Sequence, residues 1–370
     1  MPRLDILREV QIIRTPRLLQ MESIFDVPSA ERSVETWAID FDLPEQWNVG
    51  LIVGPSGAGK STIARELFPD AMADAWEWSE DKSVVDGFPK GMSIKEITSL
   101  LCSVGFSSPP SWVRPFRVLS NGEQFRVHMA RTLAEMPTLC VADEFTSVVD
   151  RTVAQIGSAA IAKTVRRRGQ KFVAVTCHYD VAEWLEPDWV YQPHTGEFFA
   201  GRRERRPPIN LTIRRVDRSA WRLFRKHHYL SSILLGDAIC FAAFFYNRPV
   251  AFVAVTHFPH PKTKRIMREH RLVCLPDFQG VGIGNALSEW AGQYFTAQGK
   301  RYRSISSHPA VNAYRGNSPH WSFQRASVAG EVLTGRTGNL TGSLWKRNTI
   351  NTRLTQTFEF VAATQIAPDR

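Results

Sequence analysis

The chain has 370 residues, of which 43% are hydrophobic and 22% are charged, and its formal net charge is +10. This length exceeds what one hydrophobic core usually serves, so we expect two domains, and the composition excludes a mostly disordered or fibrous chain. No apolar stretch approaches the roughly 20 residues of a membrane helix, and the N-terminus lacks an apolar signal core, so we expect a cytoplasmic protein without a membrane partner.

The first 200 residues alternate between strand and helix patterns. Three segments within residues 1–48, QIIRT, LLQMESIFDV and ETWAIDF, alternate apolar and polar positions and predict a small sheet. From residue 49 on, the apolar strands VGLIVG, TLCVAD and KFVAVTC alternate with helical stretches that follow Ser61, Ser120 and Val149. This alternation predicts an α/β domain over residues 1–200, with a parallel sheet covered by helices on both faces, as in nucleotide-binding proteins.

A glycine-rich loop follows the first of these apolar strands. Its sequence fits G-x-x-x-x-G-K-[ST] between a strand and a helix, the context in which this pattern binds nucleotide phosphates. We expect the backbone N–H groups and the start of the helix to bind ATP, Lys60 to reach its β- and γ-phosphates, and Ser61 to bind Mg²⁺. The predicted ATP-binding residues here are Gly54, Pro55, Ser56, Gly57, Ala58, Gly59, Lys60, Ser61 and Thr62.

Four further segments follow in a fixed order: LSNGEQ at 119–124, TLCVADE ending in Asp143 and Glu144, SVVD at 147–150, and His178 after KFVAVTC. Alone, each has a simpler interpretation, because an acidic pair often caps a helix and a lone histidine is usually a surface or core residue. Together they resemble the ATP-binding cassette (ABC) ATPases, whose signature is LSGGQ, with Asn121 replacing the first signature glycine.

The resemblance implies roles for these residues and a partner. Asp143 would hold magnesium through water, Glu144 would polarise the attacking water, and His178 would act as the switch histidine at the γ-phosphate. Ser120 and Gly122 of the signature would complete the ATP site of an opposite subunit, so a homodimer is implied. The short helical subdomain and the missing membrane domain favour the soluble family members that act on DNA, RNA or ribosomes over transporter subunits.

The sequence departs from the family in one respect. No glutamine occurs between Ile63 and Glu123, so the glutamine loop that senses magnesium is missing or replaced, with Asp81 or Asp86 as substitutes. The aromatic residue that stacks on adenine is either Phe25 or Trp37.

The pattern changes at Gly201, where GRRERRPPIN begins. Its paired prolines cannot continue a helix or central strand, so we place a linker at 201–208 and a second, α+β domain at 209–370. We expect there a basic helix at 217–228, a hairpin turning at Asn247 and Arg248, and a strand RLVCLP. A helix from Gly282 to Gln298 and strands at 302–307 and near 355–361 would follow.

A second glycine turn follows RLVCLP, with the sequence QGVGIG before a helix. It resembles motif A of the GNAT acyltransferases, [QR]-x-x-G-x-[GA], which implies acetyl-CoA or another acyl-CoA as cofactor, its pyrophosphate held by N–H groups of the turn and helix. The alternative is a helix-capping turn with a packing role only. The predicted acyl-CoA residues are Leu272, Val273, Gln279, Gly280, Val281, Gly282, Ile283 and Gly284.

The same resemblance suggests catalytic residues. Glu269, ahead of the motif strand, would remove a proton from the amine through water, and Tyr314 would protonate the departing thiolate. The alternative for Glu269 is a solvated charge beside two arginines, and the alternative for Tyr314 is a half-buried aromatic residue without a catalytic role. His227, His228 and Tyr229 end the basic helix and are candidate substrate contacts, although adjacent histidines on a helix point in different directions, so at most one would serve.

As a whole, the chain resembles an ABC-type ATPase fused to a GNAT-like acetyltransferase, a class associated with phage or prokaryotic DNA modification. Residues 202–226 contain ten Lys or Arg against Glu204 and Asp217, which suits phosphate backbones. Our leading hypothesis is an ATP-dependent acyltransferase that modifies nucleic acid bases or a nucleotide-linked amine. One alternative is a nucleic-acid-binding motor or clamp with an inactive GNAT fold, and another is acetylation of a small amine or a protein lysine.

Overall fold

The fold of this computed structural model is described for residues 4–25, 31–73, 76–201, 209–228, 233–259, 263, 265–329 and 353–362. Two compact units do not follow chain order: one combines residues 1–77 and 131–207, the other 78–130 and 208–370. The break at 207 lies within the expected linker, but the expected division in chain order misses that 78–130 joins the C-terminal half. The physical reason is a set of hydrogen bonds and packing contacts between these two segments, described below.

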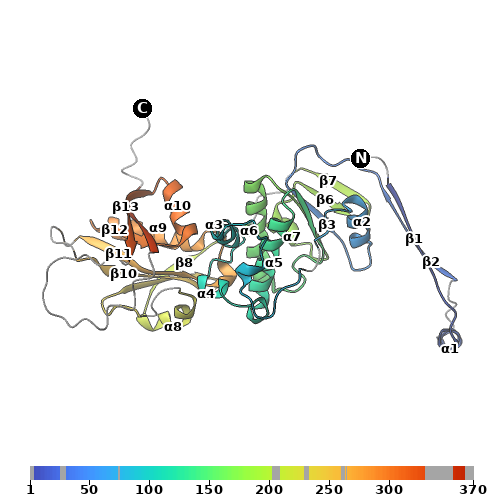
Figure 1. The fold of residues 1–370 in the computed structure, drawn as a ribbon, viewed down its shortest axis with the longest axis horizontal. Coiled ribbons are helices and arrows are strands. Elements are labelled where there is room, and N and C mark those ends of the chain that lie inside the picture. The colour runs from blue at the N-terminus through green and yellow to red at the C-terminus, as the bar shows by residue number, and fades with distance from the viewer. Residues whose placement is uncertain are drawn as a thin grey trace. The chain divides into compact units, whose positions relative to one another are not determined.

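The first unit contains a five-stranded sheet in the order β4-β5-β3-β6-β7 (Figure 1). Its strands are β3 (Val49–Val53), β4 (Leu139–Ala142), β5 (Lys171–Thr176), β6 (Trp189–Gln192) and β7 (Glu197–Ala200), and all pairs are parallel except β6 with β7. The helices are α2 (Lys60–Leu67), α6 (Arg151–Arg168) and α7 (Val181–Leu185). Every residue of β3 is buried, as in parallel strands covered on both faces, which confirms the predicted α/β architecture.

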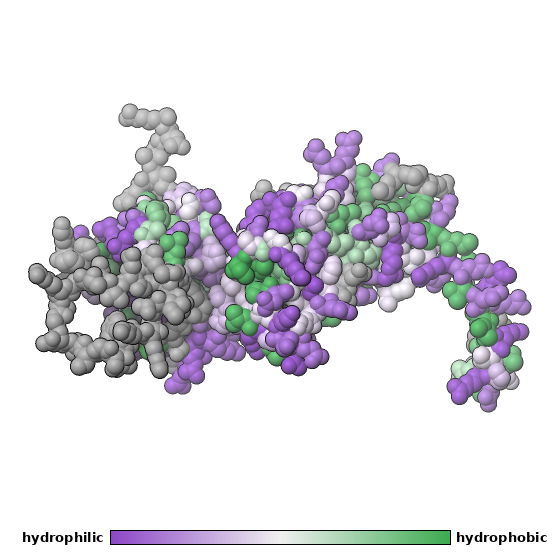
Figure 2. Space-filling model, viewed as in Figure 1, coloured by the Kyte–Doolittle hydropathy of each residue, from purple (hydrophilic) through white to green (hydrophobic). Residues whose placement is uncertain are grey.

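An arm formed by residues 4–39 belongs to the same unit. Strand β1 (Leu4–Gln11) pairs antiparallel with β2 (Arg32–Ile39), and α1 (Pro16–Phe25) lies between them. The sequence analysis predicted a strand over LLQMESIFDV, and this was wrong: Pro16 occupies the first helical turn, and the Thr15 hydroxyl accepts a hydrogen bond from the Leu18 N–H. Figure 2 shows hydrophobic residues among hydrophilic ones on this arm, and Leu7, Ile13 and Ile24 are more than half exposed.

The second unit contains a seven-stranded mixed sheet in the order β13-β14-β12-β11-β10-β9-β8. Only β11 with β12 is parallel. The strands are β8 (Thr212–Val216), β9 (Ile239–Phe245), β10 (Arg248–His257), β11 (Ile266–Cys274), β12 (Arg301–Ser306), β13 (Trp321–Ala329) and β14 (Arg353–Phe360). The expected α+β class is therefore confirmed.

Helices lie on both faces of this sheet (Figure 1). Helices α9 (Ile283–Thr296) and α10 (Pro309–Asn317) cover one face, and α8 (Trp221–Phe224), flanked by 3-10 turns at Arg218–Ala220 and Arg225–His227, packs against Phe252 on the other. The β9–β10 turn is at Tyr246 and Asn247, one residue before the predicted position. Both have positive φ, as the tight hairpin turn requires.

The segment 78–130 is mainly helical. It contains a 3-10 turn at Val84–Gly87, α3 (Ile94–Ser103), α4 (Pro109–Trp112), a second turn at Phe116–Val118 and most of α5 (Asn121–Glu135). The His308 Nε2 atom lies 3.0 Å from the Ser107 carbonyl oxygen, and the His308 ring packs near Trp112. None of the described helices is long and apolar enough to cross a membrane.

Candidate functional site

The phosphate loop connects β3 to α2. Gly57 and Gly59 have φ angles of 80° and 76°, which side chains rarely tolerate, and the space where a Cβ of Gly57 would lie is open. Gly59 is the N-cap of α2, so the first N–H groups of this helix point into the loop without an intrahelical acceptor. Lys60 donates from Nζ to the Pro55 carbonyl oxygen at 2.8 Å, inside the loop. These groups fit a bound triphosphate.

The two predicted magnesium residues, Ser61 and Asp143, lie together at the end of β4. The Ser61 hydroxyl donates to Asp143 Oδ1 at 3.0 Å, and Arg65 lies 3.8 Å from the other carboxylate oxygen. A hydroxyl and a carboxylate are oxygen ligands of the kind that Mg²⁺ takes beside nucleotide phosphates. The donor set therefore fits the expected ion.

The predicted hydrolytic carboxylate, Glu144, follows directly. Its side chain is exposed, and the Ser147 hydroxyl donates to its Oε2 at 2.7 Å. Glu144 and Thr146 both have left-handed backbone angles, with φ of 50° and 68°. Such strain in non-glycine residues is characteristic of functional sites, where surrounding structure holds a side chain in one direction.

Two further candidates lie in the same unit. His178 follows β5, where its N–H donates to the Thr176 hydroxyl at 3.2 Å. The Trp37 ring lies against the phosphate loop, since a Cβ on Gly59 would be 2.3 Å from it. The other adenine-stacking candidate, Phe25, has a side chain outside the described part of the structure.

The signature segment lies in the second unit and forms the start of α5. Ser120 and Glu123 make a reciprocal cap, in which the Ser120 N–H and hydroxyl both donate to Glu123 Oε2 at 3.0 Å. Gly122 is buried beneath it, whereas Asn121, which replaces the family glycine, is exposed. The glutamine-loop substitutes Asp81 and Asp86 are each exposed and accept a hydrogen bond from a nearby serine hydroxyl.

The second glycine turn connects β11 to α9. Gly280 and Gly282 have φ angles of 89° and 95°, Gly282 is the N-cap of α9, and the space for a Cβ above Gly282 is open. Strand β11 pairs with β12 only from Ile266 to Glu269, so the two strands are unpaired beyond that point. An open glycine turn at a helix N-terminus fits a pyrophosphate. Of the other predicted residues, Val273 and Ile283 are buried in the core, and Leu272 and Val281 are half-buried.

The base of this turn is held by a residue that the sequence analysis missed. Arg126 of α5 is fully buried and donates to the carbonyl oxygens of Asp277 at 2.7 Å, Gln279 at 3.2 Å and Gly105 at 3.3 Å. The Gln279 side chain accepts from the Ser107 N–H at 2.6 Å and donates to the Cys274 carbonyl oxygen at 2.9 Å. The first residue of the predicted acyl-CoA motif therefore binds the helical segment through its side chain.

Glu269 lies in a buried network. Its carboxylate accepts from the hydroxyls of Ser288, Tyr302 and Ser304 and forms an ion pair with Arg315 at 3.0 Å. Its side chain is only 7% exposed. Burial alone would raise the pKa of this carboxyl, but Arg315 and the serine hydroxyls outweigh it and hold the pKa below its ordinary value. With both oxygens occupied, the geometry favours a structural role, and the role as a base stays a prediction.

The predicted acid, Tyr314, is on α10 and partly exposed, and its hydroxyl donates to Glu289 Oε1 at 2.9 Å. Partial burial and this carboxylate raise its pKa. His270, next to Glu269, had no signal in the sequence. Burial and the neighbouring Arg271 and Arg268 lower its pKa to about 4, so the ring is neutral near pH 7, and its Nε2 is buried without a partner among the described residues.

The expected substrate residues are only partly described. His227 is half-buried, and its pKa is lowered by burial and by Lys226. His228 packs against Trp221, which is itself buried against Phe252 and serves the core. Tyr229 and the arginines of 202–206 lie outside the described residues.

Comparisons with known proteins found one family model and several similar proteins. Residues 181–317 match the model of the acetyltransferase (GNAT) family. Protein STAR1 of Oryza sativa subsp. japonica is 29% identical over 177 residues, which cover 37% of this chain and 49% of that protein. The chain thus spans about half the length of this curated relative.

The solved structures that resemble part of this chain include two ABC proteins. The ATP-binding cassette MJ0796, in a dimeric post-hydrolysis state bound to ADP and Pi, is 18% identical with a TM-score of 0.37, over 48% of this chain and 96% of that one. A bacterial Atm1-family ABC exporter with ATP bound is 20% identical with a TM-score of 0.33, over 43% of this chain and 33% of that one.

Proposed function

We propose that this chain is an ATP-hydrolysing ABC-type ATPase coupled to an N-acyltransferase that uses acetyl-CoA or another acyl-CoA. The acceptor would be an amine of a nucleic acid base or of a nucleotide. One observation carries the proposal: two glycine turns, with N-caps Gly59 and Gly282, each connect a strand to a helix, and the space beside Gly57 and Gly282 is open. A single chain with two such anion-binding turns suits two phosphate-bearing cofactors.

In the ATPase half, Lys60 and the loop N–H groups would hold the phosphates, and Ser61 and Asp143 would hold Mg²⁺. The ion would neutralise charge that develops on the transferred phosphoryl group. Glu144 would orient the attacking water and accept its proton, helped by the fixed position that Ser147 gives it. Because Ser120 and Gly122 belong to the signature of this family, we include a homodimer in the proposal, in which the signature of one copy serves the ATP of the other.

In the acyltransferase half, the amine nitrogen would attack the thioester carbonyl carbon, a C–N bond would form and the C–S bond would break. The amine proton would pass to a base, and the thiolate would take a proton from Tyr314. Two bases are compatible with the chemistry, Glu269 through water or His270. The Nε2 atom of His270 is buried without a hydrogen-bond partner in the described residues, but the lowered pKa of about 4 makes this ring a weak base near pH 7.

The link between the two activities is the buried guanidinium of Arg126. It lies one and a half turns of α5 after the start of the signature helix and holds the base of the acyl-CoA turn. A displacement of this helix during the ATP cycle would therefore move the carbonyl groups of Asp277 and Gln279. ATP binding would gate acyl transfer in this way.

The test is conversion of labelled acetyl-CoA by the purified full-length protein with DNA, RNA, nucleotides, small amines and protein lysines as acceptors. Transfer to a nucleic acid or nucleotide that depends on ATP and is lost in Lys60→Ala supports the proposal. Transfer only to a small amine or a lysine would show that the acceptor is not a nucleic acid or nucleotide. Unchanged acetyl-CoA, with DNA-stimulated ATP hydrolysis, would instead favour a nucleic-acid motor whose GNAT fold is inactive, a candidate favoured by the occupied carboxylate of Glu269.

A further inference from the structure

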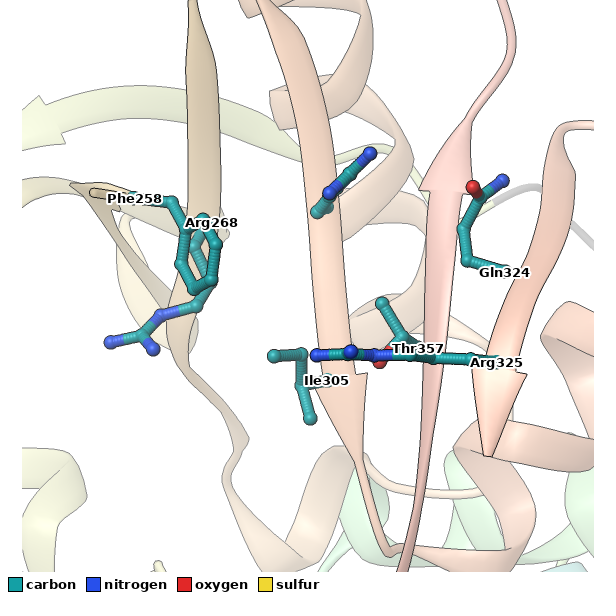
Figure 3. Close-up of a pocket in the computed structure, with 7 residues that line it drawn as sticks. Phe258, Arg268, Ile305, Gln324, Arg325 and Thr357 are labelled. Carbon is teal, nitrogen blue, oxygen red and sulfur yellow. The ribbon is translucent and has the colours of Figure 1, made fainter. Parts of the chain in front are cut away.

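The sheet of the second unit carries a cavity on the face opposite α9 and α10. It measures about 260 Å³, and its lining includes Phe258, Arg268, Arg303, Ile305, Arg325 and Thr357. In Figure 3, Arg325 extends from β13 across β14 towards Ile305, and Arg268 lies beside Phe258. No cofactor or substrate discussed above uses these residues.

The strand registers explain why three arginines meet there. Arg268 of β11 is paired with Arg303 of β12, and Arg303 with Glu359 of β14. Thr357 of β14 is paired with Ile305 on one side and Arg325 of β13 on the other. Paired residues project to the same face of a sheet and successive residues alternate, so all these side chains lie on one face. Glu269, next to Arg268, projects to the opposite face, towards α9.

The positive charge of the cavity is incompletely balanced. Glu359 accepts hydrogen bonds from Arg303 at 2.6 Å and from Arg301 at 2.6 Å. Arg268 and Arg325 form no ion pair with any carboxylate in the described part of the chain, and the Arg268 guanidinium instead lies over the Phe258 ring at 5.4 Å. Like charges on paired residues are destabilising. An anion in the cavity would remove this repulsion.

The cavity is separate from the acyl-CoA turn. Cys274, where the turn begins, is six positions after Arg268 along β11, and at about 3.3 Å per position this is roughly 20 Å. The cavity also lies where β11 and β12 stop pairing, at Glu269 and Ser304. It is therefore beside the gap between the strands rather than at the pyrophosphate site.

We infer that this cavity binds a phosphate group of the acceptor, a nucleotide either free or within a strand. The inference rests on the proposed function and names the group by which the acceptor is recognised. Arginine forks match phosphate oxygens in a bidentate manner, and Phe258 with Arg268 provides a flat surface on which a base can stack. A cavity slightly below the roughly 300 Å³ of typical ligand sites suits a sugar phosphate, with the base stacked on Phe258 and Arg268.

The test compares two double variants that each remove two positive charges, Arg268→Gln with Arg325→Gln, and the control Lys163→Gln with Arg167→Gln, both exposed on α6. Calorimetry measures binding of deoxyadenosine monophosphate, of deoxyadenosine, and of a short single-stranded oligodeoxynucleotide. We expect the wild type to prefer the phosphorylated nucleoside and the cavity variant to lose at least tenfold in affinity for it, while the control is unchanged. For the oligonucleotide, loss of the one phosphate that the cavity neutralises should reduce the slope of log K against log salt by about 0.7.

Equal binding of deoxyadenosine and its monophosphate, or wild-type affinity in the cavity variant, would overturn the inference. So would a parallel loss of coenzyme A affinity, measured separately, because the arginines would then belong to the cofactor site. If the cavity binds the monophosphate but no nucleotide is acylated, the cavity stands and the proposed acyl transfer fails. If wild type and cavity variant acylate nucleotides equally, the proposed acyl transfer stands and the inference about the cavity fails.

Discussion

At the scale of single residues, Glu144 offers the most direct test of the ATPase. Its carboxylate is exposed and fixed by the Ser147 hydroxyl, so Glu144→Gln should keep ATP binding, which depends on the loop around Lys60. Removing a general base should lower the rate of phosphate release by about 10²–10⁴-fold. A phosphate-release assay and ATP affinity, measured beside Lys60→Ala, separate loss of catalysis from loss of binding. Hydrolysis at the wild-type rate in Glu144→Gln would assign the base elsewhere.

Ionisation of Glu269 should make the free energy of unfolding depend on pH. The Glu269→Gln variant leaves the buried Arg315 guanidinium without a counter-charge and should lower the free energy of unfolding by about 3–5 kcal/mol. Because the folded pKa lies below the ordinary value of 4.5, the stabilisation is fully present above that value and is lost as pH falls through the folded pKa.

Denaturant unfolding across this acidic range should therefore show a steeper loss of stability for the wild type than for Glu269→Gln. His270→Gln, the variant of the alternative base, is the matched comparison for catalysis. If His270 takes the amine proton, acyl transfer should fall in His270→Gln with little change in stability. Full transfer in His270→Gln, with transfer lost and stability kept in Glu269→Gln, would identify Glu269 as the base.

At the scale of elements, α5 connects the signature to the acyl-CoA turn through Arg126. A lysine cannot reproduce a planar guanidinium that reaches four carbonyl oxygens, so Arg126→Lys should weaken coenzyme A binding about tenfold, equivalent to about 1.4 kcal/mol. Arg131→Lys on the same helix is the control, because Arg131 and its acceptor, the Glu77 carbonyl oxygen, both belong to the first unit. Calorimetry with coenzyme A checks this, and equal affinities in both variants would remove Arg126 from the cofactor site.

The arm of residues 4–39 allows a prediction about local stability. A two-stranded ribbon is marginally stable by itself, and most side chains of β1 and β2 are exposed, whereas every residue of β3 is buried. Amide hydrogens of β1 and β2 should therefore exchange much faster than those of β3 in mass spectrometry of the full chain. Protection of the arm equal to that of β3 would mean that another surface covers it.

The elements also show what could be predicted from sequence. Both glycine turns were found because the residues that form them are consecutive and lie between a strand and a helix. The helix α1 was missed because its apolar residues also alternate, and only the Thr15–Pro16 start distinguishes it from a strand. The role of Arg126 could not be predicted, because its partner Gln279 lies 153 residues away and nothing local distinguishes this arginine from the other polar residues of α5 as a donor to distant carbonyl groups.

At the scale of the whole molecule, the division into units explains how ATP binding and acyl-CoA binding would be coupled. The helical segment with the signature belongs to the same compact unit as the acyltransferase sheet, and the boundary between units falls within α5. The segment 119–124, which resembles the ABC signature and which we propose to bind the ATP of a second copy, thus belongs to the unit that would bind acyl-CoA. Dimerisation around ATP and occupation of the acyl-CoA turn would act on one rigid set of contacts, those of Arg126 and Ser107 with Gln279.

This arrangement predicts reciprocal linkage between the two cofactors. If ATP changes coenzyme A affinity by some factor, coenzyme A must change ATP affinity by the same factor, because both measure one coupling free energy, typically about 1–3 kcal/mol. Titrations with the slowly hydrolysing Glu144→Gln variant should give equal factors of about 5–150-fold, and Arg126→Lys in that background should reduce both towards one. Size-exclusion chromatography of the same variant should show a smaller elution volume with ATP than without it, as expected for a dimer. Independent binding of the two cofactors in Glu144→Gln would leave two activities that merely share a chain, and Arg126 would then be a packing residue.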